Sequence, residues 1–276
     1  MINYGRQFLD KKDIASVSKV LSSDWLTQGP NVEKFENALK KKFDTNYCCV
    51  VANGTAALHL TGLALGWKSG DIVIGSPISF VASNNCIIYA GATPDFVDID
   101  KTSYTIDVNQ LEKKIRFYTN QNKKVVGVVA TDYAGHPCDW EALKAISKKY
   151  NVRLINDNCH AIGASFKNDN QYASKYADVV THSYHPIKNI TTGEGGAVLT
   201  NDKTLDKKIR SLRSHGITKD PKSMNKNDGP WYYEMKELGF NYRITDFQCA
   251  LGLSQLKKLS KFIKRRKEIA KIYDFN

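Results

Sequence analysis

Residues 178–200, DVVTHSYHPIKNITTGEGGAVLT, decide the fold, because they contain two short β-rich runs joined by a polar loop. We expect the second run, Gly196–Thr200, to pair antiparallel with its neighbour, since it follows Asp178–Thr181 closely. Similar runs with helix-like stretches between most of them occur at Cys48–Val51, Asp71–Ile74, Asp95–Val97, Val125–Ala130 and Val152–Ile155. Strands that alternate with helices predict an α/β fold with a mainly parallel sheet.

Helical patterns precede and follow this alternation. Residues 11–23 have apolar side chains at helical spacing, and a second helix is expected over 31–43, after the breaker Gly29-Pro30. Residues 245–274 predict one long helix with an apolar side, and the polar stretch 217–235 predicts a mobile loop. The sequence has no internal repeat and no low-complexity linker, so we expect the sheet and its helices to form one continuous domain.

The composition is that of an ordinary globular protein, with 276 residues, 42% hydrophobic and 25% charged. It excludes a disordered chain, a collagen-like repeat and a disulfide-stapled miniprotein. No apolar run reaches the ~18 residues that a membrane span needs. The first six residues, MINYGR, lack the apolar core of a signal peptide. We therefore expect a cytoplasmic protein.

The charge and the cysteines favour no special class of ligand. The formal net charge is +12, but the lysines are scattered and no basic stripe carries interleaved aromatic residues. A solvated lysine-rich surface is the favoured interpretation over nucleic-acid binding. The six cysteines form no CxxC pair, so we expect reduced, structural thiols and no metal site.

Two local patterns follow predicted strands. Asn53–Leu58, NGTAAL, opens a helix with small residues, so its backbone N–H groups can approach a phosphate. The alternative is an ordinary tight turn. Asp157 follows the run at 152–155 and lies at the C-terminal end of the expected strand, which is where α/β folds bind ligands. The alternative is a helix N-cap.

Two further patterns lie nearer the end of the chain. Lys188 stands in an uncharged stretch that begins at Ser183 and is followed by the glycine-rich turn 191–196. Partial burial favours the neutral form of an amine, which is what a Schiff-base nucleophile requires. The alternative is a surface lysine beside a flexible loop. Residues 240–246, FNYRITD, lead into the last helix. Taken alone, the polar residues of this stretch are interpreted as ordinary helix-capping and surface groups.

In this order the four patterns resemble the pyridoxal phosphate enzymes of the aspartate-aminotransferase fold, fold type I. The resemblance is closer to one family, the DegT/DnrJ-type sugar-nucleotide aminotransferases, and runs from Tyr4 to about Tyr273. The motifs that carry it are LTQGP at 26–30, PISFVA at 77–82, Asp157 with His160, HPIK at 185–188 and NYR at 241–243. Within the family, YAGHPCD at 133–139 and ITTGEGG at 190–196 are similar to an enzyme of pseudaminic acid synthesis.

The resemblance implies a set of cofactor residues. Lys188 would hold pyridoxal phosphate through its amine and move the proton of the reaction, while Asp157 would pair with the pyridine nitrogen. Phe80 would stack on the ring and His160 would help to orient it. The phosphate would be held by Gly54, Thr55, Ala56 and Ser183, and by Asn241 of a partner subunit. The sugar nucleotide would contact Tyr4, Asp24, Trp25, Leu26 and Thr27.

The resemblance also implies the reaction. Glutamate would donate its amino group to the cofactor, and a UDP-linked 4-keto-6-deoxy-HexNAc would then receive it at C4, in a homodimer with shared sites. Lys188 favours a transaminase, because dehydratase relatives carry histidine there. The alternatives are another sugar-nucleotide aminotransferase, for example for a dTDP-sugar, and a catalytically silent fragment or binding protein on the same scaffold.

The resemblance further predicts how the chain is organised. Residues 1–43 would form N-terminal helices and a substrate loop, and residues 44–243 the cofactor-binding large domain. Residues 244–276 would begin the helix that connects to a C-terminal small domain. Because family members continue well past this point, we expect that the segment completing the small domain is absent from this chain.

Overall fold

The structure is a computed structural model that describes residues 5–226 and 228–275. Its helices are α1 (Lys11–Leu21), α2 (Pro30–Phe43), α3 (Gly54–Ala64), α4 (Ala82–Tyr89), α5 (Val108–Asn120), α6 (Trp140–Tyr150), α7 (Tyr172–Tyr176), α8 (Lys203–Arg213), α9 (Asp246–Leu256) and α10 (Leu259–Phe275). Its strands are β1 (Tyr47–Val51), β2 (Ile72–Gly75), β3 (Thr93–Phe96), β4 (Val125–Thr131), β5 (Arg153–Asp157), β6 (Val179–Ser183), β7 (Gly196–Thr200), β8 (Ile217–Thr218) and β9 (Glu234–Met235). None of the helices in the described ranges is long and apolar enough to cross a membrane.

Seven strands form the central sheet in the order β1-β7-β6-β5-β4-β2-β3. Strands β3, β2, β4, β5 and β6 run parallel, and β7 runs antiparallel to both β6 and β1. The α/β class, the mainly parallel sheet and the antiparallel pairing of Gly196–Thr200 are thereby confirmed. Because β7 reverses direction between β6 and β1, these two strands end at the same edge of the sheet.

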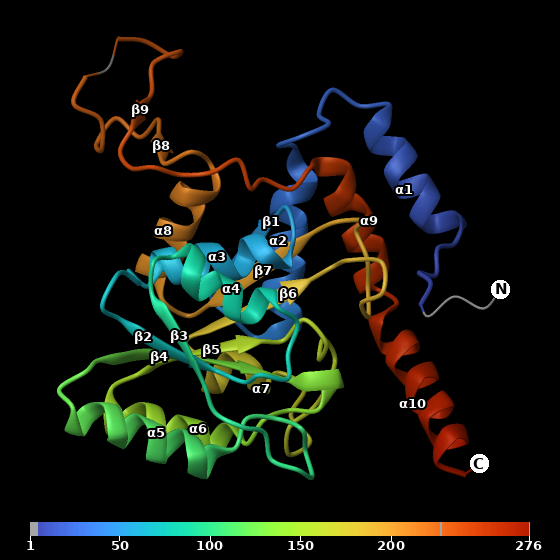
Figure 1. Ribbon diagram of the computed structural model, residues 1–276. Coiled ribbons are helices and arrows are strands. Elements are labelled where there is room, and N and C mark those ends of the chain that lie inside the picture. Colours follow the sequence, from blue (N-terminus) through green and yellow to red (C-terminus); the bar gives the residue numbers. More distant parts are fainter. Residues whose placement is uncertain (1–4, 227, 276) are drawn as a thin grey trace.

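Helices cover both faces of this sheet (Figure 1). The larger core cluster packs α2, α5 and α6 on one face through side chains such as Phe35, Leu111 and Trp140. Helices α3, α4 and α8 fill the other face through Leu60, Ile87 and Leu205. Both faces of the strands are therefore largely buried, except in the edge strand β3, which explains why most of the strands are apolar runs and do not alternate between apolar and polar residues.

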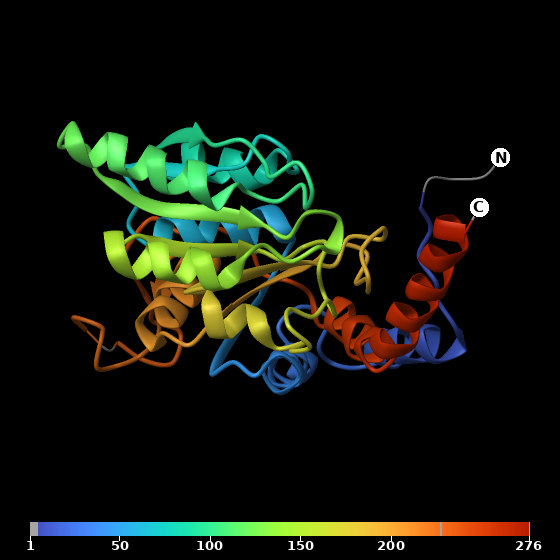
Figure 2. The same cartoon turned by 90° about the horizontal axis from the view of Figure 1, so that it is seen from below.

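Helices α1, α9 and α10 lie on the side of the molecule toward which the parallel strands point (Figure 2). The Asp13 carboxylate of α1 is buried and accepts hydrogen bonds from Gln255 Nε2 at 2.9 Å and Lys258 Nζ at 2.6 Å. Lys258 also pairs with Asp10 at 2.8 Å. These contacts join α1 to α9 and to the turn that precedes α10.

Two details of the predicted elements are corrected. Residues 245–274 form two helices, because the chain turns at Lys257-Lys258, where Lys258 is held by the two aspartates of the N-terminal segment. The stretch 217–235 is not entirely loop, since its ends pair as the two-stranded β8–β9 ribbon. This ribbon and its connection extend away from the sheet (Figure 1).

Candidate active site

A cavity of about 580 Å³ lies at the carboxyl ends of the central strands. Its walls come from the segments that follow β1, β2, β4, β5 and β6, which the parallel arrangement brings to one edge. The predicted residues that line it are Gly54, Thr55, Phe80, Asp157, His160, Ser183 and Lys188. Most of the cofactor residues expected from the sequence are therefore gathered in one place by a single chain.

Asp157 ends β5 and is only 3% exposed. Its carboxylate accepts a hydrogen bond from the Ser83 hydroxyl at 2.5 Å and one from the Cys159 backbone N–H at 3.2 Å. No helix begins at this position, because α7 starts only at Tyr172, so the N-cap alternative is wrong. Both hydrogen bonds fix the carboxylate toward the cavity.

Ser83 was missed by the sequence reasoning. It lies at the start of α4, directly after the PISFVA stretch at 77–82, and its side chain is buried. The available indication was the position of Ser83, one residue beyond the PISFVA motif that contains Phe80. The structure makes Ser83 the partner that orients Asp157.

Lys188 lies in the loop between β6 and β7. The loop is held by the buried Thr191 hydroxyl and the Thr192 N–H, which both donate to the Tyr184 carbonyl at 3.0 Å. The Lys188 N–H donates to the His185 carbonyl at 2.9 Å, and the side chain is half-buried in the cavity wall. The alternative of a surface lysine on a flexible loop does not describe this environment.

His160 lies beside Lys188 in the same wall. Burial lowers the pKa of His160, and the Lys188 charge lowers it further, while the Asp157 carboxylate opposes both. The imidazole is therefore neutral near pH 7 and can donate or accept a hydrogen bond, but it carries no charge.

The amino end of α3 forms a close-packed turn against β6 and β7. A Cβ atom on Gly54 would lie 2.8 Å from Ser183 Cβ, and one on Gly196 would lie 2.5 Å from the Asn53 carbonyl oxygen, so neither position accepts a side chain. The first N–H groups of a helix have no partner within it and attract anions. Gly54, Thr55 and Ser183 thus present donors to the cavity.

Ala56 differs from its neighbours in this turn. Its backbone N–H donates to the Asn53 side chain at 2.8 Å, and the residue is buried behind the cavity lining. The donors left for an anion are those of Gly54, Thr55 and Ser183.

The cavity fits pyridoxal phosphate in its chemistry. Among the residues that the structure describes, the buried Asp157 carboxylate meets a hydroxyl and an N–H but no cation, so a protonated ring nitrogen would complete its environment. Within the described ranges the buried Thr131 hydroxyl, also in the wall, has no hydrogen-bond partner. Phe80 is 63% exposed at the rim, where its ring is available for stacking. The α3 terminus presents N–H donors, which suit a phosphate, at the same cavity.

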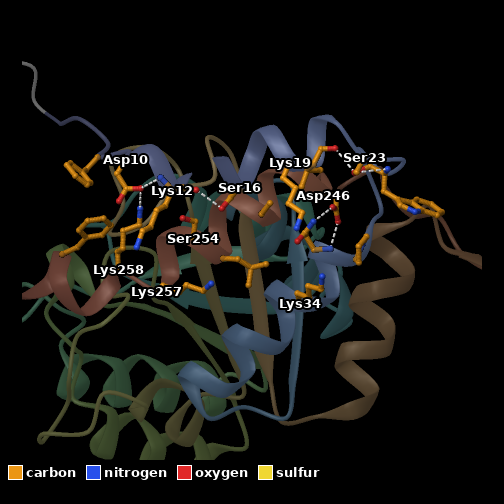
Figure 3. Close-up of a pocket in the computed structure, with 18 of the residues that line it drawn as sticks. Asp10, Lys12, Ser16, Lys19, Ser23, Lys34, Asp246, Ser254, Lys257 and Lys258 are labelled. Atoms are coloured by element: carbon orange, nitrogen blue, oxygen red, sulfur yellow. Dashed lines mark hydrogen bonds and ion pairs between the residues drawn. The ribbon is translucent and has the colours of Figure 1, made fainter. Parts of the chain in front are cut away.

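The remaining predicted residues lie elsewhere. Asn241 is exposed, forms a β-bridge with Ser214 and does not line the cavity. Asp24 and Trp25 line a separate cleft of about 900 Å³ between α1, α2 and α9, which is edged by lysines (Figure 3). Leu26 and Thr27 are exposed beside it, and Tyr4 lies outside the described residues.

Comparison with known proteins gives consistent matches over the whole chain. The model of the DegT/DnrJ/EryC1/StrS aminotransferase family matches residues 7–276. A UDP-4-amino-4,6-dideoxy-N-acetyl-β-L-altrosamine transaminase of Campylobacter jejuni is 39% identical over 274 residues, which are 99% of this chain and 69% of the relative. A GDP-perosamine synthase of Escherichia coli O157:H7 is 38% identical over 269 residues, which are 97% of this chain and 69% of the relative.

Solved structures are similar over the same length. Helicobacter pylori PseC, an aminotransferase involved in the biosynthesis of pseudoaminic acid, superposes with a TM-score of 0.89 at 36% identity, covering 99% of this chain and 69% of PseC. The pyridoxamine phosphate (PMP) form of a putative sugar aminotransferase from Streptococcus pneumoniae gives a TM-score of 0.88 at 28% identity, covering 99% and 72%.

Proposed function

The chain belongs to the DegT/DnrJ/EryC1/StrS aminotransferase family, and from this membership we propose that it aminates the C4 ketone of a UDP-linked 4-keto-6-deoxy-HexNAc with glutamate as donor. It is a pyridoxal phosphate-dependent aminotransferase with the type I fold. The observation that carries the proposal is the single cavity in which Lys188, Asp157 and the α3 terminus meet.

The choice of a UDP-sugar is supported by the named relatives. Transaminases for a UDP-linked altrosamine occur among them at 39% and 40% identity. The GDP-perosamine synthase at 38% identity supports a second candidate, in which the same chemistry acts on a sugar carried by another nucleotide.

In this proposal each side chain of the cavity has a separate role. When bound, pyridoxal phosphate supplies an electron sink for the carbon that loses its proton. The Lys188 amine would hold the cofactor and would then carry the proton that leaves the substrate carbon. Asp157, oriented by Ser83, keeps a proton on the ring nitrogen. Gly54, Thr55 and Ser183 bind the phosphate.

Two further side chains shape the binding of the ring. Phe80 covers one face from the rim, a contact of roughly 0.5–1.5 kcal/mol beyond burial. His160, neutral at the operating pH, helps to orient the ring beside Asp157. In this proposal residues 44–243 form the cofactor-binding domain, residues 1–43 the N-terminal helices with the substrate loop, and residues 244–276 the connection to a small domain.

The site is proposed to be completed by a second copy of the chain in the cytoplasm. Asn241 lies outside the cavity of its own chain, so in this proposal it reaches the phosphate of the partner's site in a homodimer. The loop at 24–27 would meet the sugar nucleotide from its exposed position.

The test is an assay of the purified protein with pyridoxal phosphate and glutamate against a panel of UDP-, dTDP- and GDP-linked 4-keto sugars. We expect a visible absorbance band that borohydride removes, and amination fastest with the UDP-linked sugar. A faster reaction with the GDP- or dTDP-linked sugar would replace the substrate proposal with the second candidate. Absence of the band would overturn the role of Lys188.

A further inference from the structure

A second cleft opens directly from the cofactor cavity. It measures about 710 Å³ and shares Tyr133, His160, Ile187 and Lys188 with the 580 Å³ cavity. From Lys188 it extends between the N-terminal segment at 5–6 and helix α10. The inner end of this cleft is therefore next to Lys188, although the cleft lies outside the space in which the phosphate turn and Asp157 are found.

The cleft is lined by cations without carboxylates. Arg6, Lys188, Arg266 and Lys267 line it, and no aspartate or glutamate does. Within the described ranges none of these four side chains forms an ion pair, and Arg266 makes one hydrogen bond, from Nη2 to the Lys188 carbonyl at 3.3 Å. Positive charges that no neighbour neutralises attract an anionic ligand.

The cleft between α1 and α9 shows that this is not a general property of a lysine-rich chain. That cleft also contains many lysines, but Asp10, Asp24 and Asp246 line it too. Its Lys258 is already paired with Asp10 and Asp13. The excess of unpaired cations without acids is a feature of the cleft beside Lys188.

We propose that the cleft beside Lys188 binds the diphosphate of the sugar-nucleotide substrate and that Arg266 is the residue that holds it. This inference rests on the proposed function. A diphosphate brings at least two negative charges, which match the cationic side chains around the cleft. A guanidinium can bind phosphate oxygens through two parallel hydrogen bonds, which suits Arg266 better than a lysine for this role.

The size and direction of the cleft favour the diphosphate over the carboxylates of the amino donor. The donor must place its amine at Lys188, and a small amino acid does not need the 710 Å³ beyond that lysine. Ligand sites for larger molecules measure roughly 300–1,000 Å³. A sugar whose C4 faces Lys188 would leave its nucleotide in the outer cleft, toward Arg6 and α10.

Helix α10 provides a matched control. Arg265 is adjacent to Arg266 and also exposed, but its Nη1 pairs with Glu268 at 3.1 Å and it does not line the cleft. Arg265→Gln and Arg266→Gln therefore remove the same charge from the same helix, and only the second removes a side chain from the cleft.

The experiment measures the equilibrium binding of UDP, and separately of inorganic pyrophosphate, to the cofactor-loaded full chain at about 0.15 M salt, where the Debye length is about 8 Å. We expect Arg266→Gln to raise the Kd for both ligands about 10- to 100-fold, the loss that follows removal of charge-assisted hydrogen bonds. We expect Arg265→Gln to stay within about twofold, since long-range charge effects are screened. The spectral half-reaction with glutamate should be unchanged in both variants, which also shows that both are folded.

Several outcomes would overturn the proposal. They are unchanged UDP binding in Arg266→Gln, equal losses in the two variants, a loss confined to the glutamate half-reaction, and failure of the wild type to bind UDP, GDP and dTDP alike. The proposed function fails separately, in the amination assay. A wild type that aminates the UDP-sugar while Arg266→Gln keeps its KM would reject only the role of Arg266. Binding of UDP through Arg266 without amination would reject only the proposed substrate.

Discussion

The cofactor cavity and the peripheral segments at 24–27 and 241 differ in what holds their side chains in place. Asp157 is 3% exposed at the end of a central strand and is fixed by two hydrogen bonds. Trp25 is 59% exposed, and Asn241 touches the rest of its chain through a bridge to Ser214. The register of the sheet positions the cavity side chains within one chain. The exposed side chains at 24–27 and 241 are not held in this way, and in the proposed function they act by contact with the substrate or a partner subunit. Changes in the two regions should therefore have different consequences.

The largest expected effect is that of Lys188→Ala in the cavity. Turnover should fall at least about 10⁴-fold, because in the proposed function the side chain both holds the cofactor and moves the proton. The loop is held by Thr191 and Thr192 and not by the Lys188 amine, so the thermal unfolding temperature should change little. Steady-state assays and a thermal melt measure the two quantities.

Lys264→Ala, an exposed change on α10, is the control for loss of one lysine charge. It should leave turnover unchanged. Residual transamination of Lys188→Ala close to the wild-type rate would remove Lys188 from the mechanism.

The next largest effect is expected for Asp157→Asn. The amide has the shape of the carboxylate but cannot stabilise a protonated ring nitrogen, so the proton-transfer step should slow roughly 10²- to 10³-fold while the cofactor stays bound. Single-turnover absorbance measurements report the step directly. Ser83→Ala, which removes one hydrogen bond to the same carboxylate, should cost only about tenfold. If Ser83→Ala matched Asp157→Asn, Ser83 would do more than orient the aspartate.

A mixing experiment tests the peripheral region. Asn241→Asp would place a negative charge near the partner's phosphate and should inactivate the site to which it contributes. When it is mixed with Lys188→Ala, half of the randomly formed dimers are mixed, and one of their two sites is intact, so about a quarter of the wild-type activity should return. No recovery after verified subunit exchange would show that each chain builds its own site.

The smallest effect on turnover is expected for Asp13→Asn, which does not line the cofactor cavity. Burial of the Asp13 carboxyl raises its pKa, but hydrogen bonds from Lys258 and Ser254 outweigh it and leave the pKa below its ordinary value. A lowered folded-state pKa gives stability that is present above about pH 4 and is lost as the pH falls through the folded value.

The variant should therefore lose about 2 kcal/mol of unfolding free energy at pH 7, measured by denaturant titration. This difference from the wild type should shrink in acid, below about pH 4. A difference that stays constant with pH would mean that the ion pair with Lys258 contributes nothing to it.

The sequence predicted the cavity better than its surroundings, for a physical reason. Asp157, Ser183 and Lys188 lie at or next to strand ends, and the alternation of strands and helices determines where strands end. Ser83 was missed because its role comes from a contact with Asp157, 74 residues away in the chain, and the neighbouring PISFVA motif does not indicate that partner.

The division of the predicted long helix at 245–274 was missed for a similar reason. The apolar spacing continues through Lys257-Lys258, so local periodicity predicts one helix. The turn coincides with the ion pairs of Lys258 to Asp10 and Asp13, some 245 residues earlier in the chain. The cationic cleft beside Lys188 was also hidden, because its arginines come from opposite ends of the sequence.

The bond between Asp13 and the residues Gln255 and Lys258 also bears on how the protein is made. Asp13 and Gln255 are separated by 242 residues in the chain. Helix α1 therefore leaves the ribosome long before α9, against which it packs, has been synthesised. At translation rates of about 5–20 residues per second, the delay is on the order of ten to fifty seconds. During that time the parallel strands can assemble, but α1 has nothing to bury its apolar side against. The first helix to be synthesised is therefore among the last to dock.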